Sequence, residues 1–297
     1  MGVGMTIHWM TWSPFLASDK GGLLGATEIR ALASELGVVP TKKLGQNFVH
    51  DANTIRRIVA LAGVSSSEHV LEVGPGLGSL SLGLVETGAH VTAVEIDPRL
   101  AARLSQTVLD HVPQARLDVV RGDALSITDL PGDISVLVAN LPYNTSVPIV
   151  LHLLRLLPGI QRVMVMVQAE VAERLAASPG TKSYGGPSVK AAWFGHWSIA
   201  GSVSRQVFWP IPNVDSLLVG MRARETPGDD TLRGIVWDLV DHAFATRRKM
   251  VRGALSGYLG ADRVSDVITQ AGLNPQARGE QWSLDEFVAL AQVVRAQ

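Results

Sequence analysis

The sequence contains no cysteine, an absence that excludes disulfide bonds, thiolate metal sites and cysteine nucleophiles together. Its eight histidines show no H-E-x-x-H spacing, so a zinc site would need scattered ligands, and we expect no metal. No apolar run is long enough to cross a bilayer, because Asn140, Pro142 and His152 interrupt the longest candidate. The first residues also lack the basic region of a signal peptide. These absences predict a cytoplasmic protein without a membrane partner.

Neither sign of charge is in excess, since 26 Lys and Arg residues stand against 27 Asp and Glu residues and the net charge is −1. The sum argues neither for nor against a nucleic-acid partner, and the distribution matters more. Solvated helix faces are the common explanation of basic clusters. Two clusters lie towards the ends of the chain: Lys42, Lys43, Arg56 and Arg57, and then Arg247, Arg248, Lys249 and Arg252.

The length of 297 residues, with 46% hydrophobic and 18% charged residues, predicts one sizeable domain plus a smaller one. Residues 1–24 match no periodic pattern, and we expect them to form a flexible tail. Residues 25–225 are predicted to form the larger domain. Residues 226–297 read as a series of short helices and are predicted to form a small all-α domain.

From about residue 68 to residue 168, short β-branched runs alternate with helical patterns. The runs are apolar throughout rather than in strict period two, which is typical of parallel strands buried on both faces by crossover helices. The pattern predicts a doubly wound α/β domain. Two later β-rich stretches, 189–204 and 215–223, predict an antiparallel addition to its sheet.

A glycine-rich turn, EVGPGLG, follows the first predicted strand, with glycines at 74, 76 and 78. Such a turn lets the backbone approach a ligand closely. On this motif alone, a nucleotide-type cofactor site and a simple tight turn are about equally well supported. The next strand ends in Glu95, 21 residues after Gly74, where Rossmann-type sites place an acid on ribose hydroxyls. Asp97 has the more ordinary position of a helix N-cap, so Glu95 is assigned to the ligand and Asp97 to structure.

Two further strands are predicted to end at the same edge of the sheet, one at Asp123 in RGDAL and the other in NLPYN at residues 140–144. Each of these two motifs, taken alone, is equally typical of an ordinary turn at the end of a strand. Together, three acidic or polar strand ends beside a short glycine loop suit S-adenosylmethionine, which has no phosphate groups for a longer loop to hold. NAD is the competing cofactor, and it leaves the fourth strand end unexplained.

The combined motifs resemble the ribosomal RNA adenine dimethyltransferase family from about Lys42 to the C-terminus. The resemblance rests on KLGQNFVHD, EVGPGLG, VEID, GDAL, NLPYNTS, FWPIPNVDS, FATRRKMVRGAL and RGEQWSLDEF. It implies a Rossmann-like fold, S-adenosyl-L-methionine as cofactor and S-adenosyl-L-homocysteine as product. The cofactor-binding residues implied are Asn47, Val49, Gly74, Gly76, Glu95, Ile96, Asp123, Ala124 and Asn140.

The resemblance also implies roles for these residues. Asn47 and Val49 would close over the cofactor, Gly74 would lie near its methionine part, Glu95 on the ribose and Asp123 on the adenine. The catalytic residues implied are Asn140, Leu141, Pro142, Tyr143 and Phe208, and the RNA-binding residues are Lys42, Lys43, Arg247, Arg248 and Lys249.

The NLPY loop would have to activate a poor nucleophile, because the lone pair of the adenine amine is delocalised into the ring. The Asn140 side-chain carbonyl and the backbone carbonyl of Leu141 or Pro142 can accept its two N–H groups and orient the lone pair. Proline fixes the loop, and Tyr143 offers one face for base stacking, worth about 1–3 kcal/mol. Phe208 would cover the other face.

Within the family, the resemblance favours the branch that dimethylates two adjacent adenosines in the 3′-terminal helix loop of 16S rRNA in the immature 30S subunit. That branch is linked to kasugamycin resistance, and a monomer is expected. A 23S rRNA methyltransferase of the macrolide-resistance type is the first alternative. An assembly factor that acts mainly by binding and a dinucleotide-dependent oxidoreductase are the others. Pro187, Trp209 and Ile211 depart from the family pattern.

Overall fold

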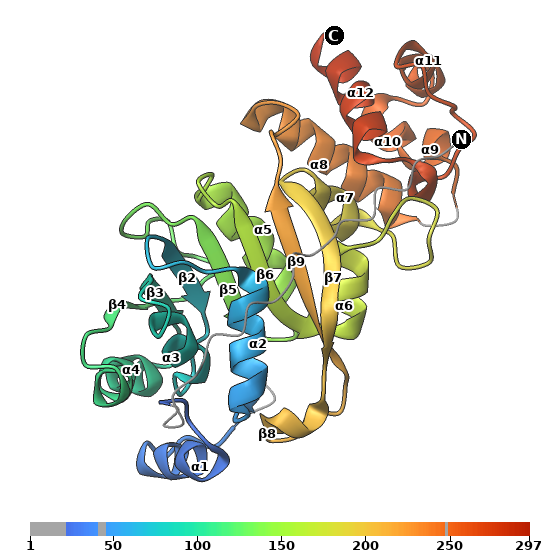
Figure 1. Ribbon diagram of the computed structural model, residues 1–297. Helices are drawn as coiled ribbons and strands as arrows, with labels where there is room; N and C mark the ends of the chain where they lie inside the picture. Colours follow the sequence, from blue (N-terminus) through green and yellow to red (C-terminus); the bar gives the residue numbers. More distant parts are fainter. Residues whose placement is uncertain (1–21, 41–45, 247–248) are drawn as a thin grey trace, which may run out of the picture.

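The computed structural model describes residues 22–40, 46–246 and 249–297, and its centre is a seven-stranded sheet with strand order β4-β3-β2-β5-β6-β9-β7 (Figure 1). The first five strands in that order run parallel, and β9 and β7 are antiparallel additions. The expected doubly wound fold with an antiparallel addition is therefore confirmed. The strands are β2 (His69–Val73), β3 (His90–Glu95), β4 (Arg116–Arg121), β5 (Val136–Asn140), β6 (Arg162–Gln168), β7 (Gly195–Val203) and β9 (Ser216–Ala223).

Helices cover both faces of this sheet (Figure 1). Along β5, Val136 and Val138 pack in one core cluster with the helices that precede it, and Leu137 and Ala139 pack in the other with α5 and the later helices. All four side chains are fully buried, which explains the continuous apolar run. The helices of this part are α1 (Ala26–Glu35), α2 (Ala52–Ala62), α3 (Ser79–Val85), α4 (Pro98–His111), α5 (Ser146–Leu156), α6 (Ala169–Leu175) and α7 (Gly186–Ala192).

Local capping fixes where two of these helices begin. The side chain of Asp51 accepts a hydrogen bond from the Thr54 amide at 2.7 Å at the start of α2. Asp97 accepts one from the Arg99 amide at 2.9 Å at the start of α4. Aspartate is a favoured N-cap residue at both positions, and the N-cap predicted at Asp97 is confirmed.

One part of the strand prediction was wrong. Residues 189–192 were assigned to a β-rich stretch, but they form the end of α7, and β7 begins only at Gly195. Helix α7 starts after Gly185, with Pro187 in its first turn, where a missing N–H costs no helical hydrogen bond. The departure from the family pattern at Pro187 is thus accommodated by a helix start.

The C-terminal helices share a hydrophobic core with the sheet. Leu239 and Phe287 belong to the same buried cluster as Val189 and Trp193 of the α7 region, so the described parts of the two predicted domains are packed together. The boundaries at residues 24 and 225 stay predictions, although Leu23 and Leu24, placed in the tail, are buried. The helices here are α8 (Asp230–Ala245), α9 (Val251–Ala254), α10 (Ser256–Leu259), α11 (Val264–Gln270) and α12 (Leu284–Arg295), with a 3₁₀ turn η3 (Gly279–Gln281).

A two-stranded ribbon lies beside the main sheet. Its strands are β1 (Phe48–Val49) and β8 (Phe208–Trp209), which pair antiparallel with Val49 opposite Phe208, and the 3₁₀ turn η2 (Arg205–Val207) precedes β8. The ribbon joins two motifs that lie about 160 residues apart in the chain. Among the described residues, no helix combines the length and apolar character that a membrane crossing requires.

His69 and His90 stack face to face at the start of β2 and β3, with ring centroids 4.0 Å apart. Together with Asp118 they form the group of described residues whose ligand atoms are close enough to hold a metal ion. The rings lie within 10° of parallel, so their in-plane lone pairs do not converge on one point. Burial lowers the pKa of His69, and the neighbouring His90 lowers it further.

The lowered pKa of His69 predicts a loss of stability in acid. As the pH falls below about 6.5, the unfolded chain binds a proton at this residue more readily than the folded protein does, so the free energy of unfolding falls. Urea unfolding between pH 7.5 and 5.5 should therefore show a shallower pH dependence for His69→Gln than for the wild type. His196→Gln, at an exposed position of β7, is the control. Equal pH dependence in the two variants would contradict this account.

Candidate cofactor and amine-binding site

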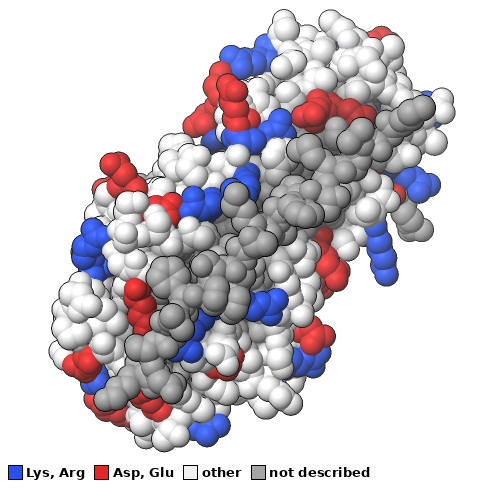
Figure 2. All heavy atoms as spheres, viewed as in Figure 1, with Lys and Arg blue, Asp and Glu red and all other residues white. Residues whose placement is uncertain are grey.

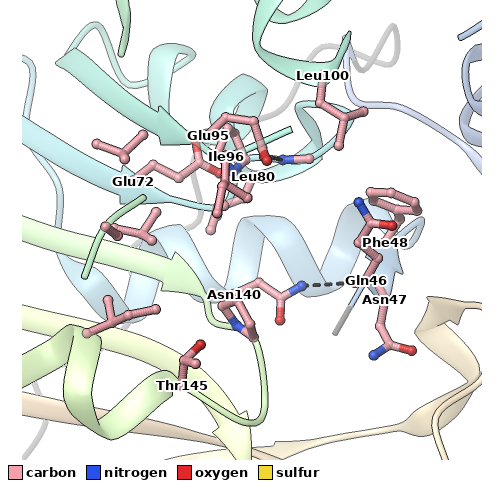
Figure 3. Close-up of a pocket in the computed structure, with 18 of the residues that line it drawn as sticks. Gln46, Asn47, Phe48, Glu72, Leu80, Glu95, Ile96, Leu100, Asn140 and Thr145 are labelled. Carbon is pink, nitrogen blue, oxygen red and sulfur yellow. Dashed lines mark hydrogen bonds between the residues drawn. The ribbon is translucent and has the colours of Figure 1, made fainter. Parts of the chain in front are cut away.

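An open pocket lies at the carboxyl edge of the parallel strands, the edge where open α/β folds bind ligands. It is lined by residues from the ends of β2, β3 and β5, from the loop after β4 and from the segment at β1. In Figure 3, Glu72 and Glu95 lie on one side of this pocket, Asn140 and Thr145 lie opposite them, and the segment from Gln46 to Phe48 forms a third side.

The glycine-rich turn forms the floor through backbone conformations that favour glycine. Gly74 has φ 68° and Gly76 has φ 58°, both in the left-handed region. The Gly74 amide donates to the Val94 carbonyl oxygen at 2.9 Å, which holds the turn against the end of β3. A Cβ atom on Gly76 would come within 2.8 Å of the Phe48 ring, whereas one on Gly74 would meet nothing closer than 3.9 Å.

Glu95 is held in place by the backbone. Its Oε2 accepts from the Gly76 amide at 3.1 Å and its Oε1 from the Asp97 amide at 2.9 Å. The side chain is buried, and this burial raises the pKa of the carboxyl although the amide donors act against it. Each oxygen retains a second lone pair that can accept from a ligand hydroxyl.

Glu72 is a second buried acid in the pocket, and the sequence reading left it without a role. Only 1% of the side chain is exposed, and its Oε2 accepts from Ser81 Oγ of α3 at 2.5 Å. Burial raises the pKa of Glu72 to about 8, so the group is mainly protonated at neutral pH. A single glutamate in the otherwise apolar run HVLEV was the sequence signal that could have revealed it.

Asp123 and two apolar side chains form the outer part of the pocket. Ile96 is 52% exposed and Leu125 is 36% exposed, and both line the pocket beside Asp123. Asp123 Oδ1 accepts from the Leu125 amide at 2.9 Å, as a turn aspartate does. Ala124 is buried beneath them. The arrangement leaves apolar surface next to a carboxylate, which suits a flat polar ring.

Asn140 and Asn47 are joined across the pocket. The Asn140 side-chain Nδ2 donates to the Asn47 backbone carbonyl oxygen at 3.0 Å (Figure 3). This bond orients the Asn140 amide, since its nitrogen is directed to the β1 segment and its Oδ1 remains an acceptor. The predicted cofactor residue Asn47 and the predicted catalytic residue Asn140 are therefore in contact.

The other residues of the NLPY motif make hydrogen bonds that hold the loop in the folded structure. Leu141 is buried and its amide donates to the Met166 carbonyl oxygen at 3.1 Å. The Pro142 carbonyl oxygen accepts from the Thr145 amide at 3.4 Å. Tyr143 is partly buried, its hydroxyl lies 3.0 Å from Ser216 Oγ of β9, and burial raises its pKa. Loop and ring are thus fixed against β6 and β9.

Phe208 is buried in this structure, and its predicted contact with the target base stays a prediction. Only 1% of its side chain is exposed, and it packs in the core cluster that contains Val49. A ring in this position presents no face to an incoming base. Its neighbour Trp209 is partly exposed and stacks on Phe48 with centroids 6.2 Å apart. Ile211 of the following loop is 66% exposed, so the bulk at Trp209 is packed and that at Ile211 faces solvent.

The predicted RNA-binding residues are only partly described. Lys42, Lys43, Arg247 and Arg248 lie outside the described residues, and Lys249 is exposed in the segment between α8 and α9. On the described surface visible in Figure 2, basic and acidic side chains are interspersed. The prediction of an RNA-binding surface therefore stays a prediction.

The charge of the pocket distinguishes between ligand classes. Among the described residues that line it, the ionisable side chains are the acids Glu72, Glu95 and Asp123, with no lysine, arginine or histidine. A pyrophosphate group would meet like charge here, so a dinucleotide fits poorly. A ligand with net positive charge and a nucleoside part fits better.

Comparison with known proteins gives a consistent result. A family model described as ribosomal RNA adenine dimethylase matches residues 40–295. A protein named ribosomal RNA small subunit methyltransferase A, from Leifsonia xyli subsp. xyli, is 58% identical over 273 residues, covering 91% of this chain and 98% of the relative. One of the same name from Rhodococcus opacus is 54% identical over 286 residues, covering 94% and 97%.

Solved structures share the fold. A dimethyladenosine transferase from Plasmodium falciparum matches with a TM-score of 0.70 and 23% identity, covering 82% of this chain and 95% of that one. The 23S rRNA methyltransferase ErmE matches with a TM-score of 0.64 and 27% identity, covering 84% and 100%. The fold extends over proteins named for different RNAs, so it does not by itself decide between them.

Alanine substitutions at the two pocket glycines should separate backbone strain from crowding. Gly74→Ala adds only the cost of a left-handed residue, about 1–2 kcal/mol. Gly76→Ala adds the same cost and also displaces the Phe48 ring, for roughly 1–3 kcal/mol more. Urea unfolding followed by circular dichroism measures both. A smaller loss for Gly76→Ala than for Gly74→Ala would contradict the packing described.

Proposed function

The chain belongs to the ribosomal RNA adenine dimethylase family, and on that premise we propose that it dimethylates N6 of two adjacent adenosines in the 3′-terminal helix loop of 16S rRNA. The methyl donor is S-adenosyl-L-methionine, and S-adenosyl-L-homocysteine is the product. The names of the relatives that are 52–58% identical support the small-subunit target over the 23S alternative. The observation that carries the chemistry is the orientation of the Asn140 amide at the pocket edge.

The pocket residues fit this cofactor. Its sulfonium supplies an electrophilic methyl group, and the acidic lining without a described cation suits its net positive charge. Glu95 can accept from the ribose hydroxyls, and Ile96 with Leu125 can pack on the adenine beside Asp123. The positive-φ turn at Gly74 allows the methionine part to approach the backbone.

The acceptor amine is oriented by Asn140 and its neighbour. Asn140 Oδ1 accepts one N6–H, because Nδ2 of the same amide is held by Asn47. The Pro142 carbonyl already accepts from Thr145, so we assign the second N6–H to the Leu141 carbonyl. With both hydrogens held, the nitrogen lone pair points at the methyl group. The oriented N6 lone pair would then accept the methyl group that the bound donor supplies, leaving the neutral thioether product, and the amine proton would pass to water.

Stacking would hold the target base, which must leave its helical stack to enter. Tyr143 is positioned by its contact with Ser216 and provides one face. Phe208 can provide the other face only after the β1–β8 ribbon moves, because its ring is buried. Lys249, with the basic residues outside the described part of the chain, would contact the phosphate backbone of the immature 30S subunit. A cytoplasmic monomer is the form we propose.

The substrate is tested by methyl transfer from labelled S-adenosyl-L-methionine to 30S particles that lack the modification. Label should enter two adjacent adenosines near the 3′ end of 16S rRNA. Parallel reactions with 50S particles and with protein-free 23S rRNA are the controls. Labelling confined to the 23S substrates would reverse the assignment, and tight 30S binding without transfer would favour an assembly factor.

Substitution of Asn140 tests the orienting role. Asn140→Ala removes the acceptor and should lower kcat on the order of 100-fold or more. Asn140→Asp retains acceptor oxygens but loses the donor to Asn47 and places a negative charge beside the sulfonium. It should bind S-adenosyl-L-methionine at least as tightly as the wild type while kcat falls, because the bound donor is stabilised more than the transition state. Wild-type kcat for Asn140→Asp would refute the proposed orientation.

A further inference from the structure

The mechanism above leaves Glu72 without a task, although it is the most deeply buried acid of the pocket. It lies in β2 beneath the glycine-rich turn, on the side of the pocket opposite Asn140 (Figure 3). Its carboxyl group accepts a hydrogen bond from the Ser81 hydroxyl of α3. A hydroxyl can donate to a carboxylate or bond to a carboxylic acid, so this partner tolerates either protonation state.

The ligands of this pocket differ in charge. S-adenosyl-L-methionine has a sulfonium, an ammonium and a carboxylate, for one net positive charge, and S-adenosyl-L-homocysteine has lost the sulfonium charge and is neutral. A unit charge that appears or disappears in a poorly solvated pocket shifts the protonation of a nearby acid strongly. An acid that is neutral in the free protein therefore responds to which of the two ligands is bound.

We propose that Glu72 gives up a proton to solvent when the cationic methyl donor binds and regains one when the neutral product occupies the pocket. Its ionised form stabilises the donor, and its protonated form removes this stabilisation after transfer. Glu72 thereby selects donor over product at neutral pH. The inference rests on the proposed function, because it requires S-adenosyl-L-methionine as the ligand.

Two other acids line the described part of the pocket, Glu95 and Asp123. Glu95 on β3 is also buried and burial raises its pKa, although an amide donor on each oxygen opposes this shift. Asp123, after β4, is exposed to solvent. The described lining from the β1 segment, α3 and the β5 end contributes no titratable side chain. Glu72 alone combines full burial with a pKa near 8, which leaves it mainly protonated at pH 7.

Isothermal titration calorimetry of the full chain tests the proposal. Binding is measured at pH 7 in three buffers of different ionisation enthalpy, with S-adenosyl-L-methionine, S-adenosyl-L-homocysteine and sinefungin, which has an amine in place of the sulfonium. The donor and sinefungin should each release most of one proton, about 0.9 for an acid of pKa 8. The product should release little. Donor affinity should rise up to about tenfold per pH unit between pH 6 and 8.

Glu72→Gln is the matched variant, since glutamine has nearly the size of the protonated acid and does not titrate. Proton release should vanish, donor affinity should fall by about 50-fold at pH 8, and product affinity should stay within about twofold. Any release that remains gives the contribution of the ligand's own amino group. Glu95→Gln should weaken binding of all three ligands, and because the Glu95 charge raises the pKa of Glu72, it should release fewer protons than the wild type but more than Glu72→Gln.

Ser81→Ala gives an independent measurement. The Ser81 hydrogen bond favours ionised Glu72, so its loss should move the pH midpoint of donor affinity upward. If Glu72→Gln does not fold, this midpoint decides the question, and an unchanged midpoint overturns the proposal. Donor binding without proton release in the wild type, or equal release in Glu72→Gln, overturns it while the proposed function stands. A folded wild type that does not bind S-adenosyl-L-methionine would remove both.

Discussion

Parallel pairing of β4, β3, β2 and β5 is the constraint on which the rest of the molecule depends. Parallel strands end at the same edge of a sheet, so the glycine turn, Glu95, Asp123 and Asn140 converge although up to 66 positions separate them. Register matters as much as direction. Val73 pairs with Val94 and Leu71 with Leu137, and a shift by one residue would turn Glu72 from the pocket to the opposite face. The long apolar strands fix this register because both faces are buried.

Two couplings close the site around this edge. The Asn140 side chain holds the β1 segment by its bond to the Asn47 carbonyl, and β1 in turn pairs with β8. Phe48 lines the cofactor pocket, while Val49 beside it lies opposite Phe208. A displacement of this ribbon would therefore change the cofactor wall and expose the buried ring in a single movement. Cofactor and base binding would then share one element, and the predicted role of Phe208 against the base would require such a movement.

The sequence was informative where chemistry is local. Strand and helix positions followed from apolar runs, and the caps at Asp51 and Asp97 followed from residue type and position. The residues it placed at the sheet edge, Glu95 and Asn140, do line one pocket. The features that the sequence did not reveal depend on contacts between residues far apart in the chain, which no local sequence pattern encodes. Phe208 is buried because it pairs with β1, and the Asn140 amide is oriented by a carbonyl 93 positions away. Glu72 lies in the EVGPGLG motif, but its protonation state depends on its burial in the folded protein and on the hydrogen bond from Ser81 of α3.

The distribution of charge across the pocket explains why the amine side uses an amide. Methyl transfer removes positive charge from the sulfonium and places it on the amine, so a carboxylate near the donor stabilises the ground state more than the transition state. The acids Glu72 and Glu95 lie on one side of the pocket, and Asn140 lies on the opposite side (Figure 3). Asn140 and a backbone carbonyl offer dipoles that hold the amine hydrogens without adding net charge next to the departing methyl group. A neutral acceptor, Asn140, thus orients the lone pair of the amine. The acids on the opposite side of the pocket provide the electrostatic attraction that holds the methyl donor.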